Sequence, residues 1–246
     1  MAEDFIAVIP ARFGSSRLPG KPLADIGGRP MVAWVYDQAL QSGARDVLIA
    51  TDDERIVAAC RDFNAPVELT ATHHESGTDR IAELAGRLGW AEDQIVVNVQ
   101  GDEPLLPPRL ISQVAGLLSE DPDAALATLA TPVKSHEEWQ DTGLARVIVD
   151  RNGRALYFSR APIPWPRDGG TPPALRHIGL YAYRVGALKQ IAATPPCELE
   201  QLERLEQLRP LWLGMKIIVA EACEVPPRGV DTEADLDAVR EQLVSA

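Results

Sequence analysis

Three cationic side chains, Arg12, Arg17 and Lys21, follow the first apolar run of the chain in a segment rich in Gly, Ser and Pro. That run, Phe5 to Ile9, predicts a buried strand, and Pro10 ends it. A loop of this composition leaves backbone N–H groups unpaired, and Arg and Lys add the charge needed to hold a polyphosphate. The alternative is a solvated surface turn with scattered charges. The position of the loop directly after a first α/β strand favours the phosphate-binding interpretation.

Acidic and capping residues follow two later elements. The run from Ile95 to Gln100 predicts a strand, and an acidic turn containing Asp102 ends it. Carboxylates at a strand end are natural Mg²⁺ ligands when a phosphate shares the metal, although a Gly-Asp pair by itself is usually only a turn. A helix is predicted over 77–88, and Ser76 or Thr78 could cap it. Its N-terminus could also receive an anion, so both interpretations stay open.

Two further segments carry polar groups. Alternation along the strand predicted over 176–184 places four residues on one face: His177, Gly179, Tyr181 and Tyr183. Such a face could be core packing or a sugar site. A helix predicted over 198–211 has leucines spaced by three, which indicates a buried stripe, and Glu206 and Gln207 lie beside that stripe.

The elements that must position these residues alternate between strand and helix. This alternation predicts an α/β fold with a mostly parallel sheet and helices on both faces. Ligands of such sheets bind beyond the carboxyl ends of the strands, where the loops described above fall. From Thr131 onward the pattern changes to two strands around Asn152-Gly153, followed by a Pro-rich stretch. A last helix begins within 229–236, with Asp231 or Thr232 as its cap.

Composition excludes several classes of protein. A net charge of -12 argues against general nucleic-acid binding and membrane-surface binding. No apolar run approaches the roughly 20 residues needed to span a membrane, so we expect no membrane insertion. The acidic start lacks the basic region of a signal peptide. Three widely spaced cysteines, Cys60, Cys197 and Cys223, are typical of structural thiols in a reducing cytoplasm.

A series of short motifs occurs in order along the chain: Ile9-Pro-Ala-Arg12, Ser16-Arg-Leu-Pro-Gly-Lys-Pro-Leu23, Ala50-Thr-Asp52, Ser76-Gly-Thr-Asp-Arg80, Asn98-Val-Gln-Gly-Asp-Glu-Pro104, Leu156-Tyr-Phe-Ser-Arg160, Ile163-Pro-Trp165, Arg176-His-Ile-Gly-Leu-Tyr181, Leu205-Glu-Gln-Leu-Arg209 and Gly229-Val-Asp-Thr232. Through these motifs the chain resembles the 3-deoxy-manno-octulosonate (Kdo) cytidylyltransferase family over nearly its whole length.

The resemblance implies a Mg²⁺-dependent reaction in which CTP and Kdo give CMP-Kdo and diphosphate, a step that activates Kdo for lipopolysaccharide assembly. It implies a Rossmann-like fold of the nucleotide-diphospho-sugar transferase kind. The whole chain, 1–246, would form one α/β domain. A smaller α+β lobe, formed largely by about 131–190, would bind the sugar and make a homodimer. We expect a cytoplasmic enzyme.

Site residues carried over from the resemblance fall into three sets. Arg12 and Lys21 would hold the CTP phosphates with Arg17 supporting the loop, and further nucleotide contacts would come from Ser76, Gly77, Thr78 and Arg80. Asp102 and Asp231 would bind Mg²⁺ and, with Lys21 and Arg12, form the catalytic set. The Kdo pocket would be lined by Gln100, Arg160, His177, Tyr181, Glu206 and Gln207. Arg160 could pair with the Kdo carboxylate.

Other activities stay open at this point. The same chemistry could act on another acid sugar, either an 8-amino Kdo analogue or a sialic acid. A nucleotide-binding regulatory module without turnover is the alternative from a different class. No general base stands out, and metal proximity with a carboxylate such as Asp231 is expected to ease loss of the hydroxyl proton. Two positions depart from the family pattern: the segment 167–175 is short, and Arg146 stands where Lys is expected.

Overall fold

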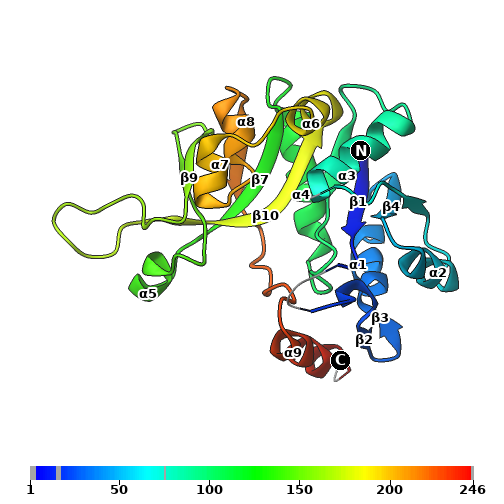
Figure 1. Ribbon diagram of the computed structural model, residues 1–246. Helices are drawn as coiled ribbons and strands as arrows, with labels where there is room; N and C mark the ends of the chain where they lie inside the picture. Colours follow the sequence, from blue (N-terminus) through cyan, green and yellow to red (C-terminus); the bar gives the residue numbers. More distant parts are fainter. Residues whose placement is uncertain (1–3, 15–17, 75, 245–246) are drawn as a thin grey trace.

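A mixed β-sheet forms the centre of the molecule in the computed structural model, which describes residues 4–14, 18–74 and 76–244 (Figure 1). Arg17 therefore lies outside the described residues. The main path of the sheet has the strand order β11-β7-β10-β6-β1-β4-β5. Its strands are β1 (Phe5–Ala11), β4 (Asp46–Thr51), β5 (Val67–Leu69), β6 (Ile95–Asn98), β7 (Leu126–Pro132), β10 (Leu175–Arg184) and β11 (Ile217–Glu221).

The direction of the strands is mostly parallel. β1 runs parallel to β4 and β6, β4 runs parallel to β5, and β7 runs parallel to β11. β10 is antiparallel to both of its neighbours in this path, β6 and β7. The predicted α/β fold with a mostly parallel sheet is confirmed, and the reversed strand β10 is an addition that the alternation of elements did not predict.

Helices cover both faces of the sheet because its buried strands point alternate side chains to opposite faces. In β1, Phe5, Ala7 and Ile9 enter one core, while Ile6 and Val8 enter the other. The first core packs against α1 (Met31–Leu40), α2 (Glu54–Asp62) and α4 (Pro108–Glu120). The second packs against α3 (Gly77–Arg87) and α6 (Val185–Ala192). No helix among the described residues is long and apolar enough to cross a membrane.

The remaining elements lie around this sheet. β8 (Arg146–Val149) and β9 (Ala155–Ser159) pair with each other, and β8 also pairs with the start of β10. They extend to one side together with α5 (His136–Gln140) and the Pro-rich stretch (Figure 1). β2 (Asp25–Ile26) and β3 (Arg29–Pro30) form a separate small antiparallel sheet after the 3₁₀ turn η1 (Lys21–Leu23). Within the range 131–190, most of β10 belongs to the main sheet, and the division into a domain and a lobe stays a prediction.

One predicted helix is wrong. The segment 198–211 forms two short helices, α7 (Glu198–Glu203) and α8 (Leu208–Trp212), because Arg204 adopts a left-handed conformation at φ 54°. The Glu203 carbonyl accepts a hydrogen bond from Arg160 Nε at 2.8 Å, and its carboxylate accepts one from Ser159 Oγ at 2.6 Å. These tertiary contacts replace the continuation of the helix. The leucine stripe is broken as a result, and Leu202 is 73% exposed.

The C-terminal helix, α9 (Glu233–Val244), begins as predicted with a capping residue. Asp235 N–H donates to Thr232 Oγ1 at 3.3 Å, and Thr232 N–H donates to Asp235 Oδ2 at 2.8 Å. This reciprocal pair is a capping box, and it selects Thr232 rather than Asp231 as the cap. Asp231 therefore precedes the helix and lies beside Lys21, near the carboxyl ends of β1 and β6.

Candidate active site

The chain reverses its direction of progress across the sheet between β1 and β6. From β1 it moves outward through β4 and β5, and then returns to place β6 on the other side of β1. The loops at such a switch point diverge and leave a crevice beyond the carboxyl ends of the strands. A cavity of about 380 Å³ lies there, and most of the predicted site residues line it: Arg12, Lys21, Ser76, Gly77, Arg80, Gln100, Asp102, Glu206 and Asp231.

Lys21 is the central cation of this cavity. Its Nζ donates to Asp102 Oδ2 at 2.7 Å and to the carbonyl of Val230 at 2.9 Å, and it lies 3.4 Å from Asp231 Oδ1. The Lys21 side chain is 14% exposed. The ammonium therefore joins the loop after β1 to the loop after β6 and to the segment before α9.

The two carboxylates fit one kind of metal site. Among the described residues, no group of three or more His, Cys, Asp or Glu side chains could hold a metal ion by itself. Mg²⁺ usually keeps several waters and binds one or two protein carboxylates together with substrate phosphates. Asp102 and Asp231 remain partly exposed beside the cavity. This donor set suits Mg²⁺ that is shared with a phosphate and does not suit a closed protein cage.

Two glycines let the loops approach Pro10 closely. A Cβ added at Gly101 would lie 2.7 Å from the Pro10 carbonyl oxygen, and one at Gly77 would lie 3.0 Å from Pro10 Cγ. The contact at Gly101 is too short for any carbon atom against a backbone oxygen, so this position requires glycine, whereas a side chain at Gly77 would require a small shift of the Pro10 ring. The backbone of Gly101 thus brings Asp102 to the edge of the cavity, while Gly77 brings the start of α3 to the opposite side.

The start of α3 has the predicted cap. Ser76 Oγ accepts a hydrogen bond from Asp79 N–H at 3.1 Å, so Ser76 and not Thr78 caps the helix. Thr78 is buried and lines a different, smaller cavity. The helix is long enough, and its N-terminus close enough to the cavity, to present positive electrostatic potential there.

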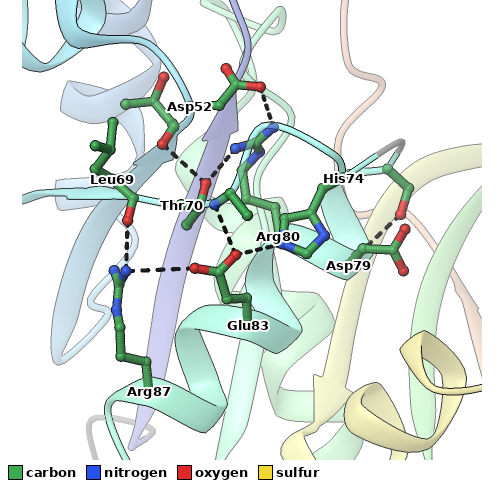
Figure 2. Close-up of polar contacts among 11 residues, drawn as sticks. Asp52, Leu69, Thr70, His74, Asp79, Arg80, Glu83 and Arg87 are labelled. Carbon is green, nitrogen blue, oxygen red and sulfur yellow. Dashed lines mark hydrogen bonds and ion pairs between the residues drawn. The ribbon is translucent and has the colours of Figure 1, made fainter.

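Arg80 is held in place before any ligand binds. Figure 2 shows its guanidinium between Asp52 and Thr70: Nη2 donates to Asp52 Oδ2 at 2.8 Å, and Nη1 donates to Thr70 Oγ1. Thr70 Oγ1 in turn donates to the Thr51 carbonyl at 3.0 Å. With 2% exposure, Arg80 ties α3 to the ends of β4 and β5. Arg80 lines the cavity, and the Asp52 carboxylate partly offsets its positive charge there.

The sequence-based prediction missed His74, which lines the same cavity. Its Nε2 lies 2.5 Å from Glu83 Oε2, which also accepts a hydrogen bond from Ala71 N–H at 2.9 Å (Figure 2). Burial opposes ionisation of Glu83, but these two contacts and Arg87 hold its pKa below the ordinary value. A histidine two positions before a helix cap was the signal that could have identified His74.

A second cavity, of about 40 Å³, lies between α3, β6, β10 and α8. Gln100, Tyr181, Glu206 and Gln207 from the predicted sugar set line it. Three polar atoms around it are buried and have no hydrogen-bond partner among the described residues: Asn98 Oδ1, Glu206 Oε1 and Gln207 Nε2. Buried polar atoms are rarely left unpaired, so these three atoms are available to water or to a polar group of a ligand.

Burial governs the ionisation of Glu206. It raises the pKa of the Glu206 carboxyl, while contacts with Thr78 and Arg209 lower it in part. Asn98 was also missed by the sequence-based prediction. As the last residue of β6 it faces the ligand side, a position that the general rule for strand ends could have identified.

His177 lies at a third cavity, of about 690 Å³, that also borders Asp102 and Asp231. Burial lowers the pKa of its imidazole to about 3. The ring centroid of His177 lies 5.3 Å from that of Tyr181, and Tyr181 lies 5.8 Å from Tyr183. The predicted shared face of these side chains is confirmed.

Arg160 does not line any of these three cavities. Its guanidinium donates to the carbonyls of Glu203 at 2.8 Å and Gly143 at 2.9 Å. Arg146 is 1% exposed and donates to the carbonyls of Leu144, Arg160 and Glu138, so its charge organises the backbone around Arg160. A ligand role for Arg160 stays a prediction.

Comparison with known proteins decides the family. A family model described as "Cytidylyltransferase" matches residues 6–217. The 3-deoxy-manno-octulosonate cytidylyltransferase of Vibrio parahaemolyticus is 54% identical over 244 residues, which cover 96% of this chain and 97% of that protein. The chain belongs to the 3-deoxy-manno-octulosonate cytidylyltransferase family. It is accordingly an enzyme, a nucleotidyltransferase.

Other relatives agree with this assignment. The proteins of the same name from Halorhodospira halophila and Pseudomonas syringae pv. tomato are each 54% identical and cover 98% and 99% of the chain, or 97% and 99% of their own lengths. A solved CMP:2-keto-3-deoxy-manno-octonic acid synthetase complexed with CTP superposes with a TM-score of 0.92 at 42% identity, covering 98% of this chain and 99% of that one. A cytidylyltransferase from Leptospira borgpetersenii, at 13% identity and a TM-score of 0.63, covers 100% of this chain and 88% of its own and shares the fold.

Proposed function

We propose that this enzyme transfers CMP from CTP to the anomeric hydroxyl of Kdo and releases diphosphate, as a step in lipopolysaccharide biosynthesis. The observation that carries the proposal is the contact of Lys21 with both Asp102 and Asp231 at the switch-point cavity. It places one compact cation and two carboxylates where a triphosphate and a shared metal would meet. The similarity to proteins named for this reaction over nearly the whole chain supports the choice of substrates.

The proposed reaction needs positioning and charge neutralisation more than covalent chemistry. The sugar hydroxyl oxygen attacks the α-phosphorus of CTP, the bond from that phosphorus to the bridging oxygen breaks, and diphosphate leaves with the bonding electrons. The hydroxyl proton passes to a nearby carboxylate such as Asp231. Arg12 and Lys21 offset the negative charge of the phosphates. The loop at Gly101 and the start of α3 both border the cavity beside Pro10, where they would position the reacting groups.

We infer that Mg²⁺ is the cofactor, held by Asp102 and Asp231 together with the phosphates of CTP. When bound, the metal neutralises phosphate charge and lowers the pKa of the attacking hydroxyl. The proposed role of Lys21 changes with the ligands: it pairs with the two carboxylates in the free enzyme and contacts phosphate oxygens once the nucleotide arrives.

The sugar would bind beside the nucleotide, where the cavities of about 40 and 690 Å³ lie. The unpaired polar atoms of Asn98, Glu206 and Gln207 suit a ligand that carries several hydroxyl groups. His177 and Tyr181 would complete the pocket from β10. Pairing of Arg160 with the Kdo carboxylate would require its guanidinium to leave the carbonyls of Gly143 and Glu203.

We further propose a homodimer that works in the cytoplasm, where CTP is available. Five large apolar side chains are exposed on β9, the Pro-rich stretch, α7 and α8: Leu156, Trp165, Leu199, Leu202 and Trp212. A second copy covering these side chains would remove them from water. The three cysteines are free thiols, as a reducing compartment requires.

Diphosphate release tests the activity directly. Purified enzyme with CTP and Mg²⁺ should release diphosphate only when Kdo is added, and a competition of Kdo, its 8-amino analogue and a sialic acid at fixed CTP should favour Kdo. The names of the relatives do not favour the other acid sugars or a non-catalytic module. Tight CTP binding without diphosphate release would overturn the proposed function.

A further inference from the structure

The hydroxyl of Thr128 lies among three polar atoms in the middle of the sheet. Its Oγ1 is 2.9 Å from His177 Nε2, 3.1 Å from the carbonyl oxygen of Ile178 and 2.8 Å from that of Leu180. Thr128 is fully buried on β7, so no solvent supplies further partners. These four groups must satisfy one another.

The Leu180 carbonyl is available because β10 bulges at this point. Ile178 pairs with Leu129 and Tyr181 pairs with Thr128, so Gly179 and Leu180 have no partner in the register with β7. A bulge leaves backbone groups outside the regular ladder. The Thr128 hydroxyl takes the place of the missing backbone donor for this part of β10.

Counting hydrogens fixes the protonation of the ring. A threonine hydroxyl has one hydrogen, and carbonyl oxygens can only accept. If that hydrogen pointed to His177, two oxygen–oxygen contacts of 2.8 and 3.1 Å would contain no hydrogen, and the Leu180 carbonyl, which has no register partner on β7, would lose this donor. The hydrogen therefore points to the carbonyls, and His177 Nε2–H donates to Thr128 Oγ1.

The ring is neutral and packs against two aromatic side chains. Burial lowers the pKa of His177 to about 3, so one nitrogen carries a hydrogen and the other does not at neutral pH. Phe158 packs edge-on at a centroid distance of 5.1 Å, and Tyr181 packs at 5.3 Å. With Nε2 protonated, Nδ1 is a bare acceptor, and it has no hydrogen-bond partner among the described residues. His177 lines the cavity that also borders Asp102 and Asp231.

We propose that Thr128 is a positioning residue: it locks His177 in the Nε2–H tautomer, so that Nδ1 faces the site as an acceptor for a hydroxyl group of the sugar. The identity of the ligand rests on the proposed function, whereas the tautomer does not. A neutral acceptor at this position discriminates between sugars by the presence of a hydroxyl donor, because a ligand that covers the acceptor without donating to it binds more weakly. Thr128 itself does not touch the ligand.

Nitrogen-15 NMR of histidine-labelled enzyme tests the tautomer without any substrate. The chain has four histidines, and comparison with His177→Gln assigns the resonances. We expect a protonated Nε2 and an unprotonated Nδ1 for His177 from pH 5 to 8. A protonated Nδ1, or an imidazolium in that range, would overturn the proposal whatever the activity of the enzyme.

Substitutions on β7 test the link to the sugar. Thr128→Val should give a mixture of tautomers and raise KM for Kdo at least about 10-fold with KM for CTP unchanged, since one hydrogen bond is lost. Thr128→Ser keeps the hydroxyl and should restore both properties. Thr131→Val is the matched control, because Thr131 is buried on the same strand and its Oγ1 has no partner among the described residues.

The outcomes separate the two proposals. An unchanged tautomer and an unchanged KM for Kdo in Thr128→Val would overturn the positioning role. If Thr128→Val does not fold, the wild-type and Thr128→Ser spectra still decide the tautomer. A wild-type enzyme with the expected tautomer and no turnover of Kdo would overturn the proposed function and leave the positioning of His177 standing.

Discussion

Lys21 and Asp102 form an ion pair with 2.7 Å between Nζ and Oδ2, although 81 positions separate them in the sequence. The pair exists because β1 and β6 are neighbours, so the loops that follow them meet at one edge of the sheet. The Val230 carbonyl and Asp231 bring a third segment to the same ammonium. One cation thus organises three loops before any substrate binds.

Removing either member of this pair should nearly abolish turnover. We expect Lys21→Ala and Asp102→Asn each to lower kcat at least about 100-fold, the scale of losing one charge contact made in the transition state. Steady-state diphosphate release measures the effect. Lys189→Ala is the control, because Lys189 forms a comparable 2.7 Å ion pair with Glu92 at the surface, away from the cavity. Wild-type turnover in Lys21→Ala would remove Lys21 from the catalytic set.

Mg²⁺ should bind weakly to the free enzyme and much more tightly when CTP is present. The reason is that the described residues supply two carboxylates and no closed cluster, so phosphate oxygens must complete the coordination. Isothermal titration with and without CTP measures this, and chelation by EDTA should stop diphosphate release until Mg²⁺ is restored. Tight Mg²⁺ binding without nucleotide would argue against the shared site.

A side chain at Gly101 should disturb the site more than the fold. The Cβ of Gly101→Ala would lie 2.7 Å from the Pro10 carbonyl oxygen, so one of the two loops must move. We expect a loss of stability of about 1–3 kcal/mol, as for other overpacked positions, and a loss of turnover larger than that destabilisation explains. In Gly86→Ala, within α3, the new Cβ meets nothing within 4 Å. That control should gain roughly 0.5–1 kcal/mol. Equal effects in both variants would contradict this account.

Acid should weaken the fold partly through His177. Its pKa is about 3 in the folded state and about 6.5 in the unfolded state, so the contribution is full above pH 6.5 and is lost as pH falls toward 3. Within this window the loss approaches about 1.4 kcal/mol per pH unit. His177→Phe should flatten the pH dependence of the unfolding free energy between pH 6.5 and 4.5, measured with urea. The exposed His136 supplies the control as His136→Gln, and an unchanged slope in His177→Phe would refute the assignment.

Replacing exposed apolar side chains of α7 and α8 by glutamate should separate the proposed dimer into monomers. Leu202→Glu and Trp212→Glu change two side chains that are 73% and 62% exposed, so the fold of the monomer should be unaffected. Light scattering should report a dimeric mass for the wild type and a monomeric mass for the variants. Leu40→Glu, at the end of α1, introduces the same charge elsewhere and should leave the mass unchanged. A monomeric wild-type enzyme would end the dimer proposal.

Much of the fold was predictable because alternating strands and helices allow few arrangements. The alternation of Phe5 to Ile9 between two cores follows from the strand period alone, and the glycines beside Pro10 sit in motifs that the sequence displays. The reversal of β10 was not predictable from its own residues, because an apolar strand reads the same in either direction. Local pattern also failed at Arg204, where hydrogen bonds from β9 end a helix that its leucines favoured.

The candidate site was predictable where a residue's type and its position in an element together indicate its role. Lys21, Asp102 and Ser76 occupy strand ends and a helix cap, and general rules point to those places. The sequence-based prediction missed Asn98 and His74 because an amide and an imidazole serve many roles in proteins. Only the folded chain shows that both line a cavity. Arg160 shows the opposite case: its charge suggested a ligand, but its guanidinium contacts backbone carbonyls in the structure.

β10 is one continuous strand that starts beside β8 and ends between β6 and β7. It therefore connects the β8–β9 hairpin directly to the part of the sheet beside the switch-point cavity, with no loop between them. The bulge at Gly179 and Leu180 is the one interruption in its register with β7 among the described pairs. It is therefore the place where β10 would bend most easily. If contact with a second copy moved the hairpin, the position of Gln100 would change with it, because Gln100 Nε2 donates to the Gly179 carbonyl at 3.2 Å.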